Sequence, residues 1–283
     1  MTSDSKEREF TFVERDFRRV CALIHARVGI ALSPSKRDMV YSRLARRLRA
    51  LGLVSFADYL DRLEANTDNE EWQAFTNALT TNLTSFFREA HHFETLGRLL
   101  LERRAASPIK IWCNAASTGE EPYSIAIAAC EAFGSLNPPV SILATDVDTN
   151  VLATAAAGVY PIERIEQLST QRRQRFFQRG SGPNTGSCRV IPELRRLIDF
   201  RQLNLLDHDY GMRGSFTAIF CRNVMIYFDK PTQYDVLSRL KPLLADDGLL
   251  FAGHSESFFH AADLLRSCGR TVYCRADRVR AAA

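Results

Sequence analysis

The stretch 109–129 is the sequence feature that most constrains the fold. It opens with Ile109-Lys110-Ile111-Trp112-Cys113, a β-branched and aromatic run typical of a buried strand. A loop of small residues up to Gly119 follows, and a helix is expected next, with Ser117 or Thr118 as its cap and Pro122 where a missing N–H costs nothing. This order predicts the first unit of a doubly wound α/β domain, which binds its ligand over this loop.

The composition of the loop narrows the ligand class. A dinucleotide-binding loop needs Gly-x-Gly-x-x-Gly, whereas Gly119 stands alone here and is followed by Glu120 and Glu121. Two acids at a helix N-terminus would repel a phosphate but suit a cationic or hydroxyl-bearing ligand. The next predicted strand, 141–145, ends in Asp146, which is placed to bind a ribose diol.

These residues together predict an adenosine site without phosphate. S-adenosylmethionine, whose sulfonium and amino groups are positive, fits the site better than NAD or ATP. The alternative is that Glu120 and Glu121 only complement the dipole of the helix.

Length and composition set wider bounds. The 283 residues have room for one large domain or two modest ones, and a net charge of +4 is too small to argue for nucleic acid. Seven cysteines without Cys-x-x-Cys spacing are typical of reduced thiols in a cytosol. The polar start of the chain has no signal-peptide core, and no apolar run of about 18 residues occurs. We therefore expect a cytoplasmic protein without membrane insertion.

Residues from about 10 to 90 have helical periodicity and almost no strand signal. A first helix stops at Gly29, a second runs from Ser33-Pro34 to Gly52, Ser55 caps a third, and a fourth starts at Asp68 or Asn69. The second helix is strongly basic: its cations are Lys36, Arg37, Arg43, Arg46, Arg47 and Arg49, against the single acid Asp38. An acidic partner surface is one interpretation of this face, and an ordinary solvated face is the other.

The polar segment 80–93 lies just before the first strand. Asn82 and Thr84 offer hydrogen bonds, and Arg88 can hold a carboxylate bidentately. The alternative is that the first two are helix caps and Arg88 is a surface ion-pair partner. We expect no metal at His91-His92, because neighbours on a helix do not face each other and no Cys, Asp or third His lies at ligand spacing.

The rest of the chain alternates helices and strands. Helices are expected at 150–157, 168–177 and 229–244, and strands at 215–221, 249–252 and 271–274. The glycine-rich turn 180–186 and the extended runs 188–191 and 197–203 predict a β-hairpin insertion. Asn204 follows the second run, where it can read an adenine edge or simply form a turn. The strand 215–221 delivers Arg222 and Asn223 without the Asn/Asp-Pro-Pro-aromatic signature of amino-group methyltransferases.

Five segments in order resemble the CheR family of chemotaxis receptor glutamate methyltransferases. They are Thr81 to Glu89 (TNLTSFFRE), Ala116 to Ser124 (ASTGEEPYS), Thr145 to Asp148 (TDVD), Cys221 to Phe228 (CRNVMIYF) and Gly253 to Ser257 (GHSES). The resemblance implies a class I S-adenosylmethionine-dependent methyltransferase with an α/β, Rossmann-like doubly wound sheet. Residues 1–90 would form an N-terminal helical domain with the basic helix at 34–51, and 91–283 the methyltransferase domain with a β-subdomain insertion at about 176–202.

The resemblance also implies the reaction and its residues. Glutamate side chains of chemoreceptor cytoplasmic helices would become methyl esters, in adaptation of chemotaxis-type signalling, with S-adenosylhomocysteine as the other product. Arg88 and Tyr227 would lie beside the transferred methyl. The cofactor contacts would be Asn82, Thr84, Arg88, Asp146, Asn204, Leu205, Arg222 and Asn223, with Glu120 and Glu121 both open as the ribose ligand.

The family further suggests partners for two surfaces. Arg43, Arg46, Arg47 and Arg49 would dock on the acidic helical bundle of a receptor, and the β-subdomain can pair with a receptor tether peptide by strand addition. We expect a monomer that binds no nucleic acid. Three rival functions have less support: a nucleic-acid methyltransferase, a non-catalytic S-adenosylmethionine sensor and a dehydrogenase.

Overall fold

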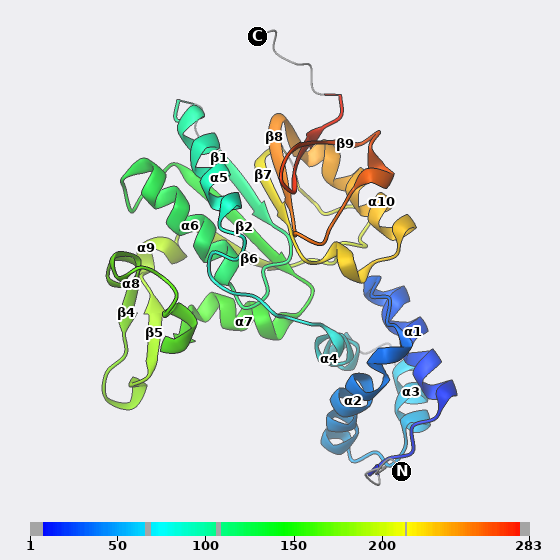
Figure 1. The fold of residues 1–283 in the computed structure, drawn as a ribbon. Helices are drawn as coiled ribbons and strands as arrows, with labels where there is room; N and C mark the ends of the chain where they lie inside the picture. Colours follow the sequence, from blue (N-terminus) through cyan, green and yellow to red (C-terminus); the bar gives the residue numbers. More distant parts are fainter. Residues whose placement is uncertain (1–7, 66–68, 106–108, 213, 278–283) are drawn as a thin grey trace, which may run out of the picture. The chain divides into compact units, whose positions relative to one another are not determined.

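The computed structural model describes residues 8–65, 69–105, 109–212 and 214–277. The chain forms two compact units (Figure 1). The smaller consists of Met1–Thr81 with Tyr227–Asp229, and the larger of Asn82–Ile226 with Lys230–Ala283. Within the described ranges, no helix has both the length and the apolar character needed to span a bilayer.

The smaller unit is built from helices, as the periodicity predicts. They are α1 (Glu14–Val28), η1 (Pro34–Lys36), α2 (Arg37–Leu51), α3 (Phe56–Ala65) and α4 (Asn69–Leu79). Phe12 packs on Phe56 with 4.4 Å between ring centroids, and Leu44 and Leu48 are fully buried. The expected cap of α3 is confirmed, because Ser55 Oγ accepts the backbone N–H of Asp58 at 3.0 Å. The alternative start at Asp68 lies outside the described residues, and α4 is described from Asn69.

The larger unit contains a seven-stranded sheet in the order β6-β2-β1-β7-β8-β10-β9. The strands are β1 (Ile109–Cys113), β2 (Val140–Asp146), β6 (Ile198–Gln202), β7 (Phe216–Cys221), β8 (Leu244–Ala252), β9 (Leu265–Gly269) and β10 (Val272–Arg275). β1 pairs in parallel with both β2 and β7, and within the described sheet β10 is antiparallel to both of its neighbours, β8 and β9, whereas the other pairs are parallel. The strand order therefore reverses between β1 and β7, which makes this the topological switch point where a doubly wound sheet binds its ligand.

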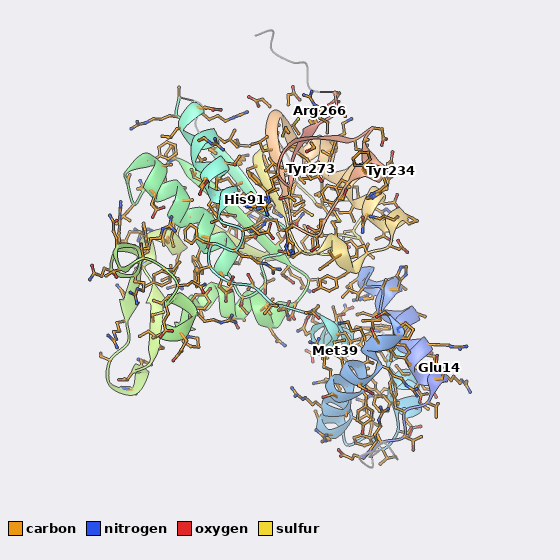
Figure 2. All side chains as sticks on the ribbon, viewed as in Figure 1. Glu14, Met39, His91, Tyr234, Arg266 and Tyr273 are labelled. Carbon is orange, nitrogen blue, oxygen red and sulfur yellow. The ribbon has the colours of Figure 1, made fainter. Side chains whose placement is uncertain are left out.

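The side chains of β1 alternate between the two faces of the sheet, and helices cover the face toward which Ile109, Ile111 and Cys113 point. Ile109, Ile111 and Cys113 belong to the main apolar core together with residues of α5 (His91–Glu102) and α6 (Glu120–Phe133), which pack against each other. Trp112 points to the other face, where its Nε1 donates to Thr145 Oγ1 at 3.0 Å. Further helices are α7 (Thr149–Ala157) and α10 (Lys230–Leu240). In the last strand, β10, Tyr273 (labelled in Figure 2) packs on Phe258, with 4.9 Å between the two ring centroids.

A second, three-stranded sheet has the order β3-β5-β4. It comprises β3 (Val159–Pro161), β4 (Phe177–Arg179) and β5 (Ser187–Val190), accompanied by α8 (Thr170–Phe176), α9 (Pro192–Arg195) and the short turns η2 (Ile162–Ile165) and η3 (Gly182–Asn184). The predicted pairing of 188–191 with 197–203 is wrong. β5 pairs with β4 across the turn 180–186, whereas α9 carries the chain on to β6, which joins the large sheet beside β2.

Two further expectations are corrected near the C-terminus. The helix expected to run to 244 ends at Leu240, and η5 (Lys241–Leu243) follows, because Pro242 has no N–H to continue the helix. Strand β9 was not expected, since most of its residues are exposed and their sequence lacks apolar alternation. The segment 82–90, which the sequence groups with the helices, lies in the larger unit, where Phe86 packs edge-on against Tyr160 and Phe177.

Gly119 offers a test of the tight turn between β1 and α6. It has φ +100°, and a Cβ there would lie 2.7 Å from Tyr160 Oη and 2.9 Å from Ala155 Cβ. We expect Gly119→Ala to lower the free energy of unfolding by about 2 kcal/mol or more, through backbone strain and overpacking together. Gly134→Ala is the matched control, because Gly134 has φ +65° but a Cβ added there would meet no described atom within 4 Å. Equal losses in denaturant unfolding of the two variants would contradict the packing argument.

Candidate functional site

The loops that follow β1, β2, β6 and β7 gather at the switch point, and they carry most of the residues expected to bind the cofactor. The loop after β2 begins at Asp146, which is 9% exposed. Its Oδ2 accepts the N–H of Ser117 at 2.8 Å and its Oδ1 that of Asp148 at 3.0 Å. Burial raises the pKa of the Asp146 carboxyl to about 6, although these N–H groups favour the ionised form. Asp146 thus joins the first two ligand loops.

Asp148 connects a third segment to these loops. It is the N-cap of α7, where Oδ1 accepts the N–H groups of Asn150 and Val151. Its Oδ2 accepts Nδ2 of Asn82 at 2.9 Å, and the Asn82 carbonyl accepts Ser117 Oγ at 3.2 Å. Asn82 therefore holds the first segment of the larger unit against the loops after β1 and β2.

The start of α6 differs from the prediction. Gly119 occupies the N-cap position and no side chain caps it, so the expected cap at Ser117 or Thr118 is wrong. Ser117 has φ +49° and gives its N–H to Asp146, while Thr118 Oγ1 donates to Glu120 Oε2 at 2.6 Å. Glu120 is fully buried, and its Oε1 lies 3.7 Å from Arg164 Nη2. This carboxylate points away from the ion pair that its neighbour forms.

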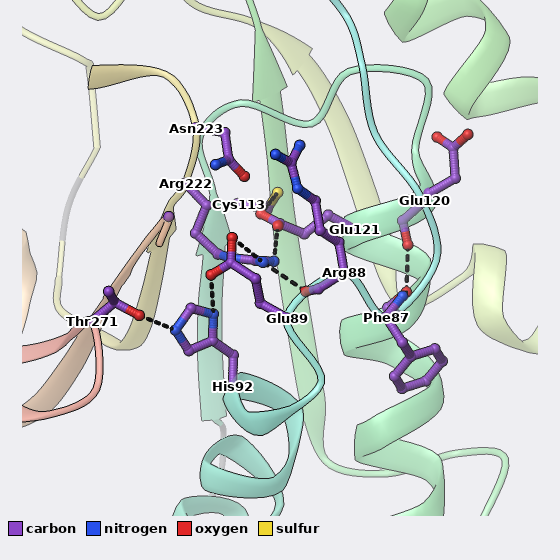
Figure 3. A network of polar contacts seen from close by, with 12 residues as sticks. Phe87, Arg88, Glu89, His92, Cys113, Glu120, Glu121, Arg222, Asn223 and Thr271 are labelled. Atoms are coloured by element: carbon purple, nitrogen blue, oxygen red, sulfur yellow. Dashed lines mark hydrogen bonds and ion pairs between the residues drawn. The ribbon is translucent and has the colours of Figure 1, made fainter. Parts of the chain in front are cut away.

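Glu121 forms a buried ion pair with Arg222, the residue that follows β7 (Figure 3). Glu121 Oε1 also accepts the thiol of Cys113 at 3.3 Å. The second arm of Arg222 donates from Nη2 to the Arg88 carbonyl at 2.6 Å and lies 3.5 Å from Glu89 Oε1. One guanidinium therefore connects β7, α6 and the segment before α5, and the two adjacent glutamates 120 and 121 have different partners.

Glu89 extends this network toward the loop after β8. It has φ +60°, and its Oε1 accepts the backbone N–H of His254 at 3.2 Å. Burial opposes ionisation of Glu89, but Arg222 and His254 outweigh it and lower the pKa of the carboxyl below its ordinary value. His92 lies 3.7 Å from Glu89 Oε2, and burial with the nearby charge of Arg222 lowers its pKa to about 3. Its Nε2 is 2.8 Å from Thr271 Oγ1.

Glu89, His91 and His92 come close enough to share a cation in the part of the chain that the structure describes. Their potential ligand atoms lie within 4.8 Å of one another, because the turn at Glu89 brings it back to the start of α5. Sequence spacing did not reveal this acid as a third group. Two features oppose a cation here: the Arg222 guanidinium next to Glu89, and the positive N-terminal end of α5. We retain the expectation of no metal.

Arg88 stands out from this network because its side chain points elsewhere. Its backbone carbonyl is bound by Arg222, while its guanidinium Nη1 donates to the Leu83 carbonyl at 3.0 Å. Thr84 contributes its carbonyl to Arg164 at 3.2 Å. Arg88 is thus anchored through its main chain, and its guanidinium has N–H donors beyond the one used by Leu83.

The loop after β6 contains Asn204 and Leu205. Asn204 Oδ1 accepts the N–H of Leu206 at 3.0 Å, so the turn-forming role left open by the sequence is present. Leu205 is buried, and its carbonyl accepts Tyr210 Oη at 2.9 Å and Arg239 Nη2 at 3.1 Å. These bonds hold the loop against the segment after it and the helix α10.

The loop after β7 carries Asn223 and leads into η4 (Met225–Tyr227). Asn223 has φ +58°, and its N–H donates to Glu256 Oε2 at 2.9 Å. Tyr227 belongs to the helical unit, where its carbonyl accepts the N–H of Ala31 at 2.8 Å. The short segment 225–227 therefore starts in the larger unit and ends in the smaller one.

The arginines of α2 are mostly engaged within the helical unit. Arg43 donates to the Thr80 carbonyl at 2.5 Å, Arg47 to both oxygens of Glu71, and Arg49 to both oxygens of Glu9. Arg46 is exposed and has no ion-pair partner among the described residues. The basic pattern therefore overstates the number of free charges, since four of the five arginines of α2 have structural contacts, including Arg37, which donates to the Phe12 carbonyl at 2.8 Å.

The chain also matches known proteins. Residues 82–274 match the family model of the CheR methyltransferase SAM binding domain, and residues 15–80 that of the CheR methyltransferase all-alpha domain. Chemotaxis protein methyltransferase 2 of Pseudomonas aeruginosa is 55% identical over 266 residues, which cover 94% of each chain. The chemotaxis protein methyltransferase of Salmonella typhimurium is 54% identical over 257 residues, covering 91% of this chain and 88% of the relative. That of Escherichia coli is 52% identical over 257 residues, covering 91% and 89%.

These matches agree with the sheet order and with the ligand loops at its switch point, and they confirm the predicted resemblance and the predicted S-adenosylmethionine cofactor. The chain belongs to the CheR family of S-adenosylmethionine-dependent chemotaxis protein methyltransferases.

Proposed function

We propose that this methyltransferase transfers the methyl group to glutamate side chains on the cytoplasmic helices of a chemoreceptor. The product is a γ-methyl ester, and its formation adjusts receptor signalling during adaptation. The observation that carries the proposal is the placement of Arg88, a cationic side chain whose main chain is fixed beside the cofactor loops by the buried Arg222. Such a group suits an anionic carboxylate acceptor better than an amine or a nucleobase.

The cofactor would occupy the loops at the switch point. Asp146 is the group for the ribose hydroxyls, since it is the last residue of β2, the position that binds a ribose diol in such folds. Glu121 lies with Arg222 at the tips of β1 and β7, while Glu120 is directed toward Thr118 and Arg164. This difference favours Glu121 as the glutamate closer to the ligand. The remaining expected contacts are Asn82, Thr84, Asn204, Leu205 and Asn223.

The reaction needs no general base. A glutamate carboxyl with an ordinary pKa of about 4.3 is ionised at pH 7 and is already the nucleophile. Its oxygen attacks the sulfonium methyl in line: the new O–CH₃ bond forms as the S–CH₃ bond breaks, and the bonding pair leaves with sulfur to give neutral S-adenosylhomocysteine. The protein then contributes mainly orientation, which can lower a barrier by roughly 7–11 kcal/mol. Arg88 would hold the carboxylate and Tyr227 would hydrogen-bond it.

Two surfaces are available for the receptor. Arg46 presents an exposed charge on α2, with Arg43, Arg47 and Arg49 on the same helix, and an acidic helical bundle is the complementary partner. The three-stranded sheet has β3 and β4 at its edges, where an extended tether peptide could add as a further strand. A nucleic-acid substrate has less support, because the segment after β7 lacks the Asn/Asp-Pro-Pro-aromatic signature of amino-group methyltransferases.

Arg88→Ala tests the catalytic assignment. We expect methyl transfer to receptor-containing membranes to fall by about 100-fold or more, because the carboxylate loses its orienting partner. S-adenosylmethionine affinity should change much less. Arg98→Ala is the matched control, since Arg98 is an exposed arginine of α5 whose hydrogen bond to Thr95 Oγ1 is long, at 3.4 Å. Unchanged turnover in the Arg88 variant would remove this residue from the mechanism.

The raised pKa of Asp146 predicts a pH dependence of cofactor binding. A pKa of about 6 means that the free protein holds a proton on this carboxyl below pH 6, and only the ionised form can accept hydrogen bonds from both ribose hydroxyls. Ionising it between pH 4 and 6 also costs folding free energy, because the folded state binds the proton more tightly than the unfolded state. Bound cofactor offsets that cost.

We therefore expect S-adenosylmethionine affinity, measured by calorimetry, to weaken by up to about tenfold per pH unit below pH 6. Asp146→Asn should bind weakly at every pH and lose this dependence. Affinity that stays constant from pH 5 to 7 in the unaltered protein would remove Asp146 as the titrating ligand.

A further inference from the structure

The loop after β8 contains a buried carboxylate that the assigned reaction leaves unexplained. Glu256 is 6% exposed and lies three residues after Gly253. Its Oε2 accepts the backbone N–H of Gly253 at 2.5 Å and that of Asn223 at 2.9 Å, and its Oε1 accepts that of Met225 at 2.8 Å. Two of these three N–H groups belong to the loop after β7, which is a different loop from its own.

These bonds fix a strained part of the β7 loop. Asn223 has φ +58°, a left-handed conformation that costs a non-glycine residue about 1 kcal/mol or more. It persists because the N–H groups on either side of Val224, from Asn223 and Met225, are both directed at the same carboxylate. The neighbouring Arg222 forms the buried pair with Glu121, so the position of this loop also sets the position of that guanidinium.

Gly253 provides a second, independent link between the two loops. A Cβ at Gly253 would lie 2.3 Å from Asn223 Nδ2, 2.9 Å from Asn223 Cγ and 2.9 Å from the Asn223 backbone N. The φ of Gly253 is not in the left-handed region, so the backbone itself would accept alanine. Glycine is needed here because the Asn223 side chain passes directly over it.

We propose that Glu256 is a positioning residue for cofactor binding, which acts by holding the Asn223 backbone and, through it, the Asn223 side chain and Arg222. Gly253 contributes by leaving room for the Asn223 side chain. The proposal rests on the proposed function only where it takes Arg222 and Asn223 as cofactor contacts.

The three backbone N–H groups that point at Glu256 require an ionised carboxylate. Three N–H donors converge on two oxygens, and a carboxylate has acceptor sites for all of them. A glutamine would place an NH₂ group against at least one N–H donor, leaving that donor buried and unpaired. Burial raises the pKa of Glu256, while the same N–H groups act against that shift.

The direct test is Glu256→Gln, with Asp16→Asn as the matched control. Asp16 is also a buried carboxylate, 7% exposed, that accepts a backbone N–H, from Val13 at 3.1 Å, but it lies in the helical unit. We expect Glu256→Gln to weaken S-adenosylmethionine binding, measured by calorimetry, by about tenfold or more, and to raise the KM for the cofactor in parallel. Asp16→Asn should leave the affinity unchanged even if its melting temperature falls as far.

A double-mutant cycle keeps the test decisive if Glu256→Gln does not fold. Gly253→Ala alone should weaken cofactor binding, because the new methyl group displaces the Asn223 side chain. In an Asn223→Ala background the same change should cause a clearly smaller loss, since the side chain that it displaces is gone and only the contact with the Asn223 backbone N, 2.9 Å from the added Cβ, remains. Additive losses, or wild-type affinity in Glu256→Gln, would overturn the proposal. Binding is measured without receptor, so failure of receptor methylation is a separate result that concerns only the proposed function.

Discussion

The buried ion pair between Glu121 and Arg222 is the interaction on which the site depends most. A doubly wound sheet leaves a crevice between β1 and β7, and the two loops that border it must be held at a fixed spacing to bind anything. Here one residue from each side meets its opposite charge away from solvent. Each charge needs the other, because a buried ion without a partner is strongly destabilising. The other terminal nitrogen of Arg222, Nη2, donates to the carbonyl of Arg88, the residue proposed to hold the substrate carboxylate.

Around this pair, carboxylates take different roles according to their surroundings. Asp146 has a raised pKa and two N–H partners, which is the environment expected of the proposed ribose ligand. Asp148 caps α7 through one carboxylate oxygen and accepts a hydrogen bond from the Asn82 side chain through the other. Glu256 accepts two backbone N–H groups of the loop after β7. A site so rich in acids is compatible with a sulfonium ligand and unfavourable for a phosphate, which agrees with the single glycine of the first loop.

Local pattern was sufficient to predict the parts of the fold that are local. The strand, loop and helix at 109–129 and the helices of the N-terminal unit follow from periodicity, glycine stops and side-chain caps within a few residues. The β-hairpin prediction was wrong because β5 pairs with β4, which precedes it, and because the short helix α9 that separates β5 from β6 has only four residues. The expected cap at Ser117 failed because its side chain is engaged elsewhere: Ser117 Oγ donates to the carbonyl of Asn82, 35 positions away.

The supporting residues of the site were harder to predict for the same physical reason. Glu89 and Glu256 stand in segments that were noted for their resemblance to the family, but their roles come from contacts with His254 and Asn223, which lie 165 and 33 positions away. No spacing rule reports such contacts. For the basic helix α2, the sequence predicted too much free charge. A charge pattern shows how many arginines there are, but not how many are already paired, as Arg47 is with Glu71.

The most direct test of carboxylate methylation is the chemical nature of the product. Labelled methyl should pass from S-adenosylmethionine to receptor-containing membranes and then leave as volatile methanol under mild alkali, because a glutamate methyl ester is hydrolysed where a methylamine or a methylated base is not. Label that remains on the protein after alkali would contradict carboxylate methylation. Cofactor binding without any labelled protein would contradict a receptor methyltransferase and indicate a sensor.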